Sequence, residues 1–223
     1  MNFSQLFINK HLAAIFFCVL CMNFVGLPVT HAQSSCSWLN IQPVINGLEL
    51  EEGDWVADIG SRQGTYLNQI AEVIGNEGHI FAVDINPDGF DGLHQHMDSW
   101  DYHNISTVYS VPDNPLLPRS SFDAIMMRNA YHEFTDPTGM LEHFKASLKP
   151  GGQLAILDTM DDDYRDKSRD VQYENHRLNI DYAIEDLKST GFEITIKERK
   201  LRHYQNDESQ PYTWLIIATP TSR

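Results

Sequence analysis

The sequence predicts an α/β fold: a seven-stranded, mostly parallel sheet with an antiparallel last strand and helices on both faces. Short apolar runs alternate with amphipathic stretches along the chain, which is typical of βαβ units. A glycine-containing loop follows the first apolar run, where such sheets bind ligands. Only a polar stretch around Gln205 to Gln210 separates the last two strands, so we expect them to pair as a hairpin.

Strands are expected where short apolar runs are bounded by glycine, proline or charged residues. They lie at Trp55 to Ile59, His79 to Ile85, Ile105 to Tyr109, Phe122 to Met127, Gln153 to Leu157, Phe192 to Ile196 and Trp214 to Ala218. Gly60 ends the first strand, and Pro150-Gly151-Gly152 turns the chain into the fifth. Helical stretches between most of the strands indicate parallel pairing.

Helices are expected where apolar side chains recur at spacings of three and four. They lie at Tyr66 to Ile74, Pro87 to Trp100, Pro137 to Leu148 and Ile180 to Ser189. Gly75 ends the first helix and Gly191 ends the last, while Gly89 and Gly92 weaken the second. The stretch from Asp161 to Asp170 is densely charged, so we interpret it as a solvated loop.

The first 32 residues have the pattern of a secretory signal peptide. Lys10 precedes an uncharged apolar run from Leu12 to Leu27, and Pro28 ends that run. We expect cleavage after Ala32, which leaves residues 33–223 as an exported, periplasmic or secreted domain without stable membrane association. An uncleaved anchor is the alternative, but this run is short for a membrane span and contains Asn23.

Composition and charge exclude several classes of protein. The chain has 223 residues, of which 42% are hydrophobic and 21% charged, and this mix excludes a disordered tail, a collagen and a coiled coil. The net charge of −15 repels phosphate backbones and anionic lipids. We therefore expect no nucleic acid and no membrane surface among the partners.

The loop after the first strand and the end of the second strand form a candidate cofactor site. The loop runs from Asp58 to Gly64, and Asp84 follows 20 residues after it, where a carboxylate can accept the hydroxyls of a ribose. A nicotinamide site requires Gly-x-Gly-x-x-Gly, but those positions hold Gly60, Arg62 and Thr65. One match in three argues against a nicotinamide oxidoreductase.

At this point the sequence resembles the class I S-adenosylmethionine-dependent methyltransferases, in particular exported, type 11-like bacterial members that act on small molecules. The matching motifs are Asp58 to Gly64 with Arg62 in place of the middle glycine, Asp84 as the second acid, Phe122 to Ile125 with Tyr131 to Phe134, and Leu148 to Leu154. They stand in the family's order, and the resemblance runs from about Val44 to Ala218. It implies a Rossmann-like fold and S-adenosylmethionine as cofactor.

The resemblance also implies roles around the methionine end of the cofactor. Gly60, Ser61 and Gly64 would lie against the methionine part. Asp58 would orient the loop or meet the amino group. Arg128, at the end of the fourth strand, is included among the cofactor-binding residues.

At the nucleoside end the resemblance places Asp84 on the ribose hydroxyls and Ile85 on the adenine. Family members often carry an aspartate after the third strand that contacts the adenine amino group. Here Ser110-Val111 occupy that place, and Asp113 comes too late to be a secure substitute.

Methyl transfer is a one-step displacement that depends mainly on proximity and alignment, and it needs a base only when the acceptor must lose a proton. We expect His132 to be that base, with Glu133 orienting it or facing solvent; alternatively His132 caps the next helix or packs under the cofactor. His176, in Asn175-His176-Arg177, resembles part of a His-Arg element of exported bacterial members. It is expected to face the substrate opening, with a surface loop as the alternative.

No metal site is expected. Metal-dependent O-methyltransferases place carboxylates after strands four and five, whereas Arg128-Asn129 follow strand four and only Asp158 ends strand five. His94 and His96 are two apart and face different directions on a helix.

The sequence thus predicts a metal-independent methyltransferase with a small-molecule acceptor. The alternative is an exported non-catalytic protein that keeps the fold and binds an adenosyl ligand, because the methyl donor is made in the cytoplasm.

Overall fold

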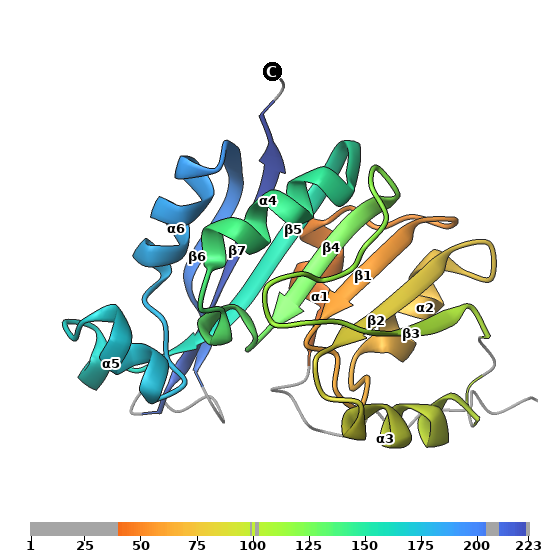
Figure 1. Cartoon of the computed structure of the whole chain (residues 1–223), viewed down its shortest axis with the longest axis horizontal. Helices are drawn as coiled ribbons and strands as arrows, with labels where there is room; N and C mark the ends of the chain where they lie inside the picture. Colours follow the sequence, from red (N-terminus) through yellow and green to blue (C-terminus); the bar gives the residue numbers. More distant parts are fainter. Residues whose placement is uncertain (1–39, 99, 101–102, 204–209, 222–223) are drawn as a thin grey trace, which may run out of the picture. The chain divides into compact units, whose positions relative to one another are not determined.

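The computed structural model describes residues 40–98, 100, 103–203 and 210–221, and the expected signal segment 1–32 lies outside them. Its centre is a seven-stranded sheet in the order β3-β2-β1-β4-β5-β7-β6 (Figure 1). The strands are β1 (Trp55–Ile59), β2 (His79–Asp84), β3 (Ile105–Tyr109), β4 (Phe122–Arg128), β5 (Leu148–Met160), β6 (Phe192–His203) and β7 (Tyr212–Pro220). All seven expected strands are therefore present.

The direction of the strands confirms the expected architecture. Strands β1 to β5 pair parallel, and β7 inserts antiparallel between β5 and β6. The chain moves outward from β1 through β2 to β3 and then returns to place β4 on the other side of β1. Such a reversal opens a crevice at the carboxyl ends of the two central strands, which is where ligands bind in these sheets.

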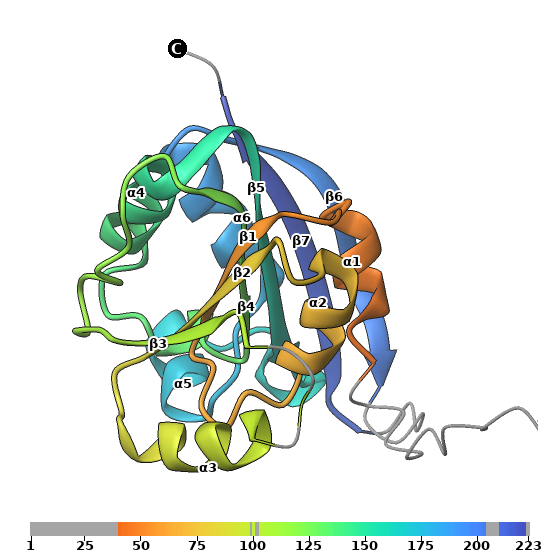
Figure 2. The ribbon, with the colours of Figure 1, turned by 90° about the vertical axis from the view of Figure 1, so that its right-hand side faces the viewer.

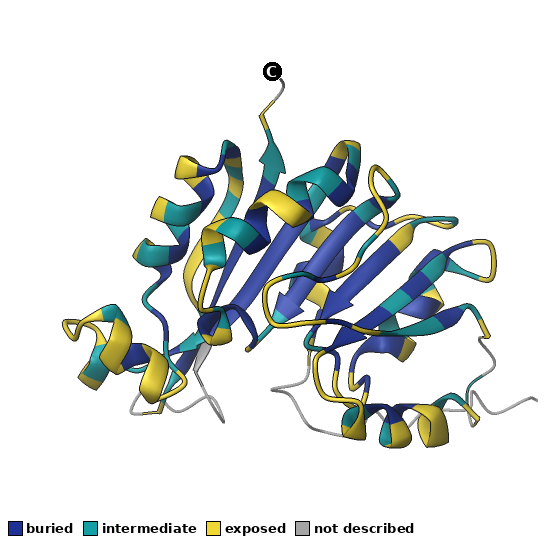
Figure 3. Ribbon diagram, in the orientation of Figure 1, coloured by how far each residue is buried: buried dark blue, intermediate teal, exposed yellow. Residues whose placement is uncertain are grey.

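Helices cover both faces of the sheet (Figure 2). They are α1 (Gln42–Gly47), α2 (Leu67–Ile74), α3 (Asp88–Met97), α4 (Pro137–Ser147), α5 (Arg169–Glu174) and α6 (Ile180–Ser189). Side chains of α1, α2 and α3 share one apolar cluster with Val56 and Ala124, whereas those of α4 and α6 share the other with Ala57 and Ile125. Successive residues of β1 and β4 thus face opposite layers, and the strands between the layers are buried (Figure 3).

The fifth strand begins earlier than the sequence predicts. Leu148 already pairs with Phe122, and the register then shifts before Gln153 meets Ala124. Gly152 packs so closely there that a Cβ would lie 2.8 Å from the carbonyl oxygen of Phe122. The Pro-Gly-Gly turn is therefore a bulge inside the strand rather than its beginning.

The stretch 161–170 is solvated as predicted, since none of its residues is buried, but it is not an irregular loop throughout. It contains a 3₁₀ helix, η3 (Asp162–Tyr164), and α5 begins at Arg169. The fully buried Gln172 holds the segment, because its side-chain amide donates to the carbonyl oxygens of Tyr164 (3.0 Å) and Lys167 (2.9 Å). Charge density thus predicts the exposure of this stretch but not the buried amide that anchors it.

Two further findings concern the chain as a whole. The described residues belong to one compact unit, Cys36–Arg223. None of the helices in the described ranges has the length and apolar character that crossing a membrane requires.

Candidate functional site

A cavity of about 620 Å³ opens at the carboxyl ends of the central strands. It lies between the loop after β1, the ends of β2 and β3, the segment after β4, and α5. Its lining residues are Ile59, Gly60, Arg62, Gln63, Val83, Asp84, Ile85, Asn86, Asp88, Gly89, Ser110, Val111, Pro112, Asn129, Ala130, Glu133, Phe134, Thr135, Met140 and Tyr173. This is the place that the strand order indicates for a ligand.

The loop after β1 brings bare backbone to the cavity. Gly60 has φ +75°, and a Cβ on it would lie 2.8 Å from the Cβ of Ala130. Arg62 also has a positive φ, +47°, which explains why the related motif has a glycine at this position. The Arg62 side chain is exposed, while its backbone N–H donates to Oδ2 of Asp84 over 2.9 Å. Arg62 therefore adopts the positive φ that the loop requires, and its exposed side chain does not fill the space inside the loop.

Asp84 connects the loop to the end of β2. Its other carboxylate oxygen, Oδ1, accepts the N–H of Asn86 over 2.8 Å, and the residue is 7% exposed. Each oxygen retains lone-pair capacity toward the cavity, because a carboxylate accepts about four hydrogen bonds. Ile85 follows with half of its surface exposed, and buried Ser110 stands at the end of β3. Asp113 does not line the cavity.

A polar cluster lies behind the loop, on the α2 side of the sheet. Asp58 is buried, and burial, followed by the charge of Asp84, raises its pKa to about 7, while the charge of Arg128 opposes that rise. The Arg128 guanidinium lies 4.9 Å from the centre of the Tyr66 ring. The hydroxyls of Ser61 and Tyr66 are both buried and have no hydrogen-bond partner among the described residues.

On the other side of the cavity, His132 and Glu133 lie on the 3₁₀ helix η2 (Tyr131–Glu133). His132 is 6% exposed, and its Nδ1 lies 2.8 Å from Oδ1 of the fully buried Asp158. Its Nε2 lies 3.0 Å from Oε1 of Glu133, and Nδ1 of His176 lies 2.6 Å from the same oxygen. Burial alone would lower the pKa of His132, but the hydrogen bonds and charges of Asp158 and Glu133 raise it. Glu133, not His132, lines the cavity.

Tyr131 anchors η2 to α5 and α6, the two helices on either side of His176 in the chain. Its hydroxyl donates to Asp186 of α6 over 2.9 Å, and Arg169 of α5 pairs with the same carboxylate at 2.7 Å. Burial and the charge of Asp186 raise the pKa of Tyr131 far above its usual value. Tyr131 is thus a structural support behind the cavity rather than part of its lining.

The structure brings the residues predicted from the sequence to one region, but only some of them line the cavity. Gly60, Asp84, Ile85 and Glu133 line the cavity, whereas Asp58, Ser61, Gly64 and Arg128 lie outside the lining, and His132 and His176 flank Glu133. Gly64 faces α3, where a Cβ would lie 2.4 Å from Leu93. Sequence reasoning missed Tyr173 as a lining residue, and it missed Asp158 as the partner of His132. Nothing in the local sequence pattern marks these contacts.

Comparisons with known proteins agree with this geometry. Residues 57–154 match the family model of a methyltransferase domain. A protein-L-isoaspartate O-methyltransferase of Methanothrix thermoacetophila is 23% identical over 130 residues, which cover 58% of this chain and 59% of that protein. A demethylmenaquinone methyltransferase of Listeria welshimeri is 27% identical over 112 residues, covering 50% and 48%. The chain thus matches about half of the length of these relatives.

The crystal structure of an S-adenosylmethionine-dependent methyltransferase from Aquifex aeolicus has the same fold. It superposes with a TM-score of 0.66 at 22% identity and covers 80% of this chain and 88% of that one. The methyltransferase-domain match begins inside β1 and ends inside β5, so it includes every strand end that lines the cavity. Residues 57–154 therefore match a methyltransferase domain, and the described part of the chain has the fold of an S-adenosylmethionine-dependent methyltransferase.

Proposed function

We propose that this chain transfers a methyl group from S-adenosylmethionine to a small-molecule acceptor inside the cavity. The observation that carries the proposal is that Asp84, the expected ribose ligand, and Glu133, on the opposite side, line the same cavity. Its volume of about 620 Å³ falls within the range of roughly 300–1,000 Å³ of small-molecule sites. One relative is named for a protein acceptor and another for demethylmenaquinone, so the relatives do not choose between the two classes of acceptor. The volume of the cavity supports a small molecule.

The residues present fit the cofactor at both of its ends. The Arg128 guanidinium, whose charge acts on Asp58, lies over the ring of Tyr66, and the buried hydroxyls of Tyr66 and Ser61 have no hydrogen-bond partner among the described residues. An amino-acid group carries an ammonium and a carboxylate, which can satisfy such a set. At the nucleoside end, Asp84 retains acceptor capacity for two hydroxyls.

When bound, the cofactor supplies an electrophilic methyl group on a sulfonium that leaves as a neutral thioether. The chain's residues align the acceptor and remove its proton where it has one. Glu133 is the group placed to receive that proton, because its carboxylate faces the cavity. His132 and His176 fix the Glu133 carboxylate, and Asp158 fixes His132. A magnesium site of the O-methyltransferase type is not part of this proposal, since Asp158 is already bonded to His132.

Calorimetric titration of the purified protein with S-adenosylmethionine and S-adenosylhomocysteine, with NADH as a control, tests the proposal. We expect both adenosyl compounds to bind and NADH not to bind. A screen of small acceptors for release of S-adenosylhomocysteine follows. A folded sample that binds neither compound contradicts the proposal. Binding without turnover of any acceptor favours the non-catalytic adenosyl-ligand binder.

We also propose that the protein is exported by its N-terminal segment. The support is the pattern of residues 1–32, which lie outside the described part of the chain. Protein isolated from its native host is expected to begin at Gln33 and to fractionate outside the cytoplasm. A protein that begins at Met1 and stays in the cytosol contradicts this proposal.

A further inference from the structure

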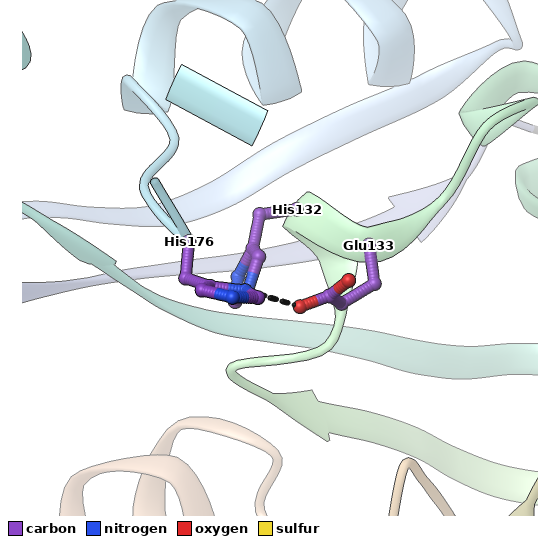
Figure 4. Close-up of side chains that lie close together, drawn as sticks. All are labelled: His132, Glu133 and His176. Atoms are coloured by element: carbon purple, nitrogen blue, oxygen red, sulfur yellow. Dashed lines mark hydrogen bonds and ion pairs between the residues drawn. The ribbon is translucent and has the colours of Figure 1, made fainter. Parts of the chain in front are cut away.

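His132, Glu133 and His176 bring three potential ligand atoms together beside the cavity. Figure 4 shows His132 and Glu133 on η2 and His176 approaching from a separate segment. Nε2 of His132 and Nδ1 of His176 both contact Oε1 of Glu133, and these three potential ligand atoms lie within 4.8 Å of one another. In the part of the chain that the structure describes, no other three His, Cys, Asp or Glu side chains converge in this way.

Hydrogen bonding to Asp158 leaves the other ring nitrogen of His132 directed at Glu133. The Asp158 carboxylate accepts two backbone N–H groups, from His132 (3.0 Å) and Thr159 (2.6 Å), so it is an acceptor and Nδ1 of His132 donates to it. Nε2 of His132 then lies 3.0 Å from Oε1 of Glu133, the same oxygen that Nδ1 of His176 approaches. A cation among these three atoms would be held by one bond from each side chain.

We propose that His132, Glu133 and His176 bind a divalent transition-metal ion of the Zn²⁺ class. Two imidazoles and one carboxylate suit Zn²⁺ and its neighbours in the first transition row, whereas Mg²⁺ and Ca²⁺ prefer oxygen ligands alone. Three protein ligands leave a position open, as in catalytic zinc sites. This site departs from the metal-free centre expected from the sequence, because its ligands come from segments that no motif connects.

The surroundings of the three side chains resemble those of a metal centre. Metal-binding histidines usually donate their second nitrogen to a carboxylate, which fixes the ring, and Asp158 does this for His132. His176 is held at φ +53°, and the neighbouring Arg177 N–H donates to the carbonyl oxygen of Gln172 over 2.9 Å. Buried Gln172 also accepts the N–H of Asn179 over 2.7 Å, so the segment carrying His176 is anchored on both sides.

Since Glu133 lines the cavity, the open position of the ion would face the acceptor, and with the ion bound Glu133 would act as its ligand rather than as the base. An ion there favours acceptors that coordinate metals, such as thiols and hydroxyl compounds. This consequence rests on the proposed function, whereas binding of the ion does not. The two can therefore fail separately.

The test uses tag-free protein stripped with a chelator and titrated with Co²⁺, followed by visible absorption, and with Zn²⁺, followed by calorimetry. We expect one ion per chain. His176→Ala is the decisive variant, because the His176 side chain is 70% exposed and its loss leaves the core unchanged. It should weaken binding at least about tenfold, and so should Glu133→Gln. His176→Cys, which restores a ligand, should recover binding.

His143→Ala is the matched control, since His143 is an exposed histidine on α4. It should bind Co²⁺ like the parent protein. Absence of ion binding, or binding that His176→Ala and Glu133→Gln leave unchanged, overturns the proposed site and favours a second proton on His132. Titration of metal-free protein with S-adenosylhomocysteine separates the two proposals, because donor binding without the ion leaves only the proposed function standing.

Discussion

The two sides of the cavity differ in what forms them. On the donor side, which comprises Gly60, Arg62, Asp84 and Ile85, backbone groups and one carboxylate face the ligand. On the acceptor side, which comprises η2, Asp158 and His176, side chains hold one another across long sequence separations. Positive φ angles and close packing define the donor side. Hydrogen bonds between histidine and carboxylate side chains define the acceptor side.

This difference separates binding from specificity. A backbone loop fixed by glycines keeps its shape when neighbouring side chains change, so a whole family can share one donor site. A network of side chains changes with each substitution, so the acceptor side can differ between relatives with different substrates. Variants of the donor side should therefore affect cofactor binding, and variants of the acceptor side should affect local stability or turnover.

Asp84→Ala should have the largest effect on the donor side. It removes the acceptor for the ribose hydroxyls and also the anchor for the Arg62 N–H. Two hydrogen bonds to a charged group contribute roughly 1.5–3 kcal/mol each, so the affinity for S-adenosylhomocysteine should fall at least about a hundredfold. Calorimetry measures this change.

Asp91→Ala provides the control for Asp84→Ala. Asp91 is an exposed acid in the first turn of α3 and does not line the cavity. Its removal should leave the affinity unchanged. Equal affinities in the parent protein and in Asp84→Ala would place the cofactor elsewhere.

Asp58→Asn should change the pH dependence of stability. The pKa of Asp58 is about 7 in the folded protein, whereas the ordinary pKa of an aspartate is 3.8, so between these values the folded protein keeps a proton that unfolding releases. The free energy of unfolding should therefore fall with rising pH across this window, by at most about 1.4 kcal/mol per pH unit. The variant should lack this contribution, so the difference between the two proteins should grow up to about pH 7 and then stay constant. Urea denaturation at several pH values measures it, and a constant difference from pH 5 to 8 would contradict the raised pKa.

Tyr131→Phe tests the acceptor side. It removes the hydroxyl that donates to Asp186, but Arg169 still pairs with that carboxylate. We expect a loss of about 1.5 kcal/mol in the free energy of unfolding, with an unchanged affinity for S-adenosylhomocysteine. Tyr182→Phe is the control, because the Tyr182 ring also contacts Arg169, but within the described ranges its hydroxyl makes no hydrogen bond to this network. Equal losses of unfolding free energy in the two variants would mean that the hydrogen bond from the Tyr131 hydroxyl to Asp186 does not contribute to stability.

Local sequence pattern indicates positions on the donor side but does not record the side-chain contacts of the acceptor side, for a physical reason. Asp58, Gly60 and Asp84 follow directly from strand ends and turn residues, so local pattern places them. The contact between His176 and Glu133 spans 43 positions, and that between His132 and Asp158 spans 26. Such pairs form only after β5 and the segment around α5 have folded against η2, and no local period records them.

Arg62→Gly should have the smallest effect and gives the sharpest test of the donor side. A positive φ costs an ordinary residue about 1–2 kcal/mol, and the greater freedom of unfolded glycine offsets about 0.5–1 of that. By this balance the free energy of unfolding of the variant should lie between about 0 and 1.5 kcal/mol above that of the parent protein. The affinity for S-adenosylhomocysteine should change less than about threefold, because the N–H bond to Asp84 remains and the side chain is exposed.

Gln63→Gly is the matched control for Arg62→Gly, since Gln63 is the next residue, is also exposed and also lines the cavity, but has no positive φ. The same change should therefore destabilise the protein there by roughly 0.5–1 kcal/mol. Opposite signs at adjacent positions would show that backbone conformation, not the loss of a side chain, governs this loop. A tenfold or larger gain of affinity in Arg62→Gly would instead show that the guanidinium obstructs the cavity. The non-catalytic alternative would then regain support, because the native chain would hold its own donor site partly closed.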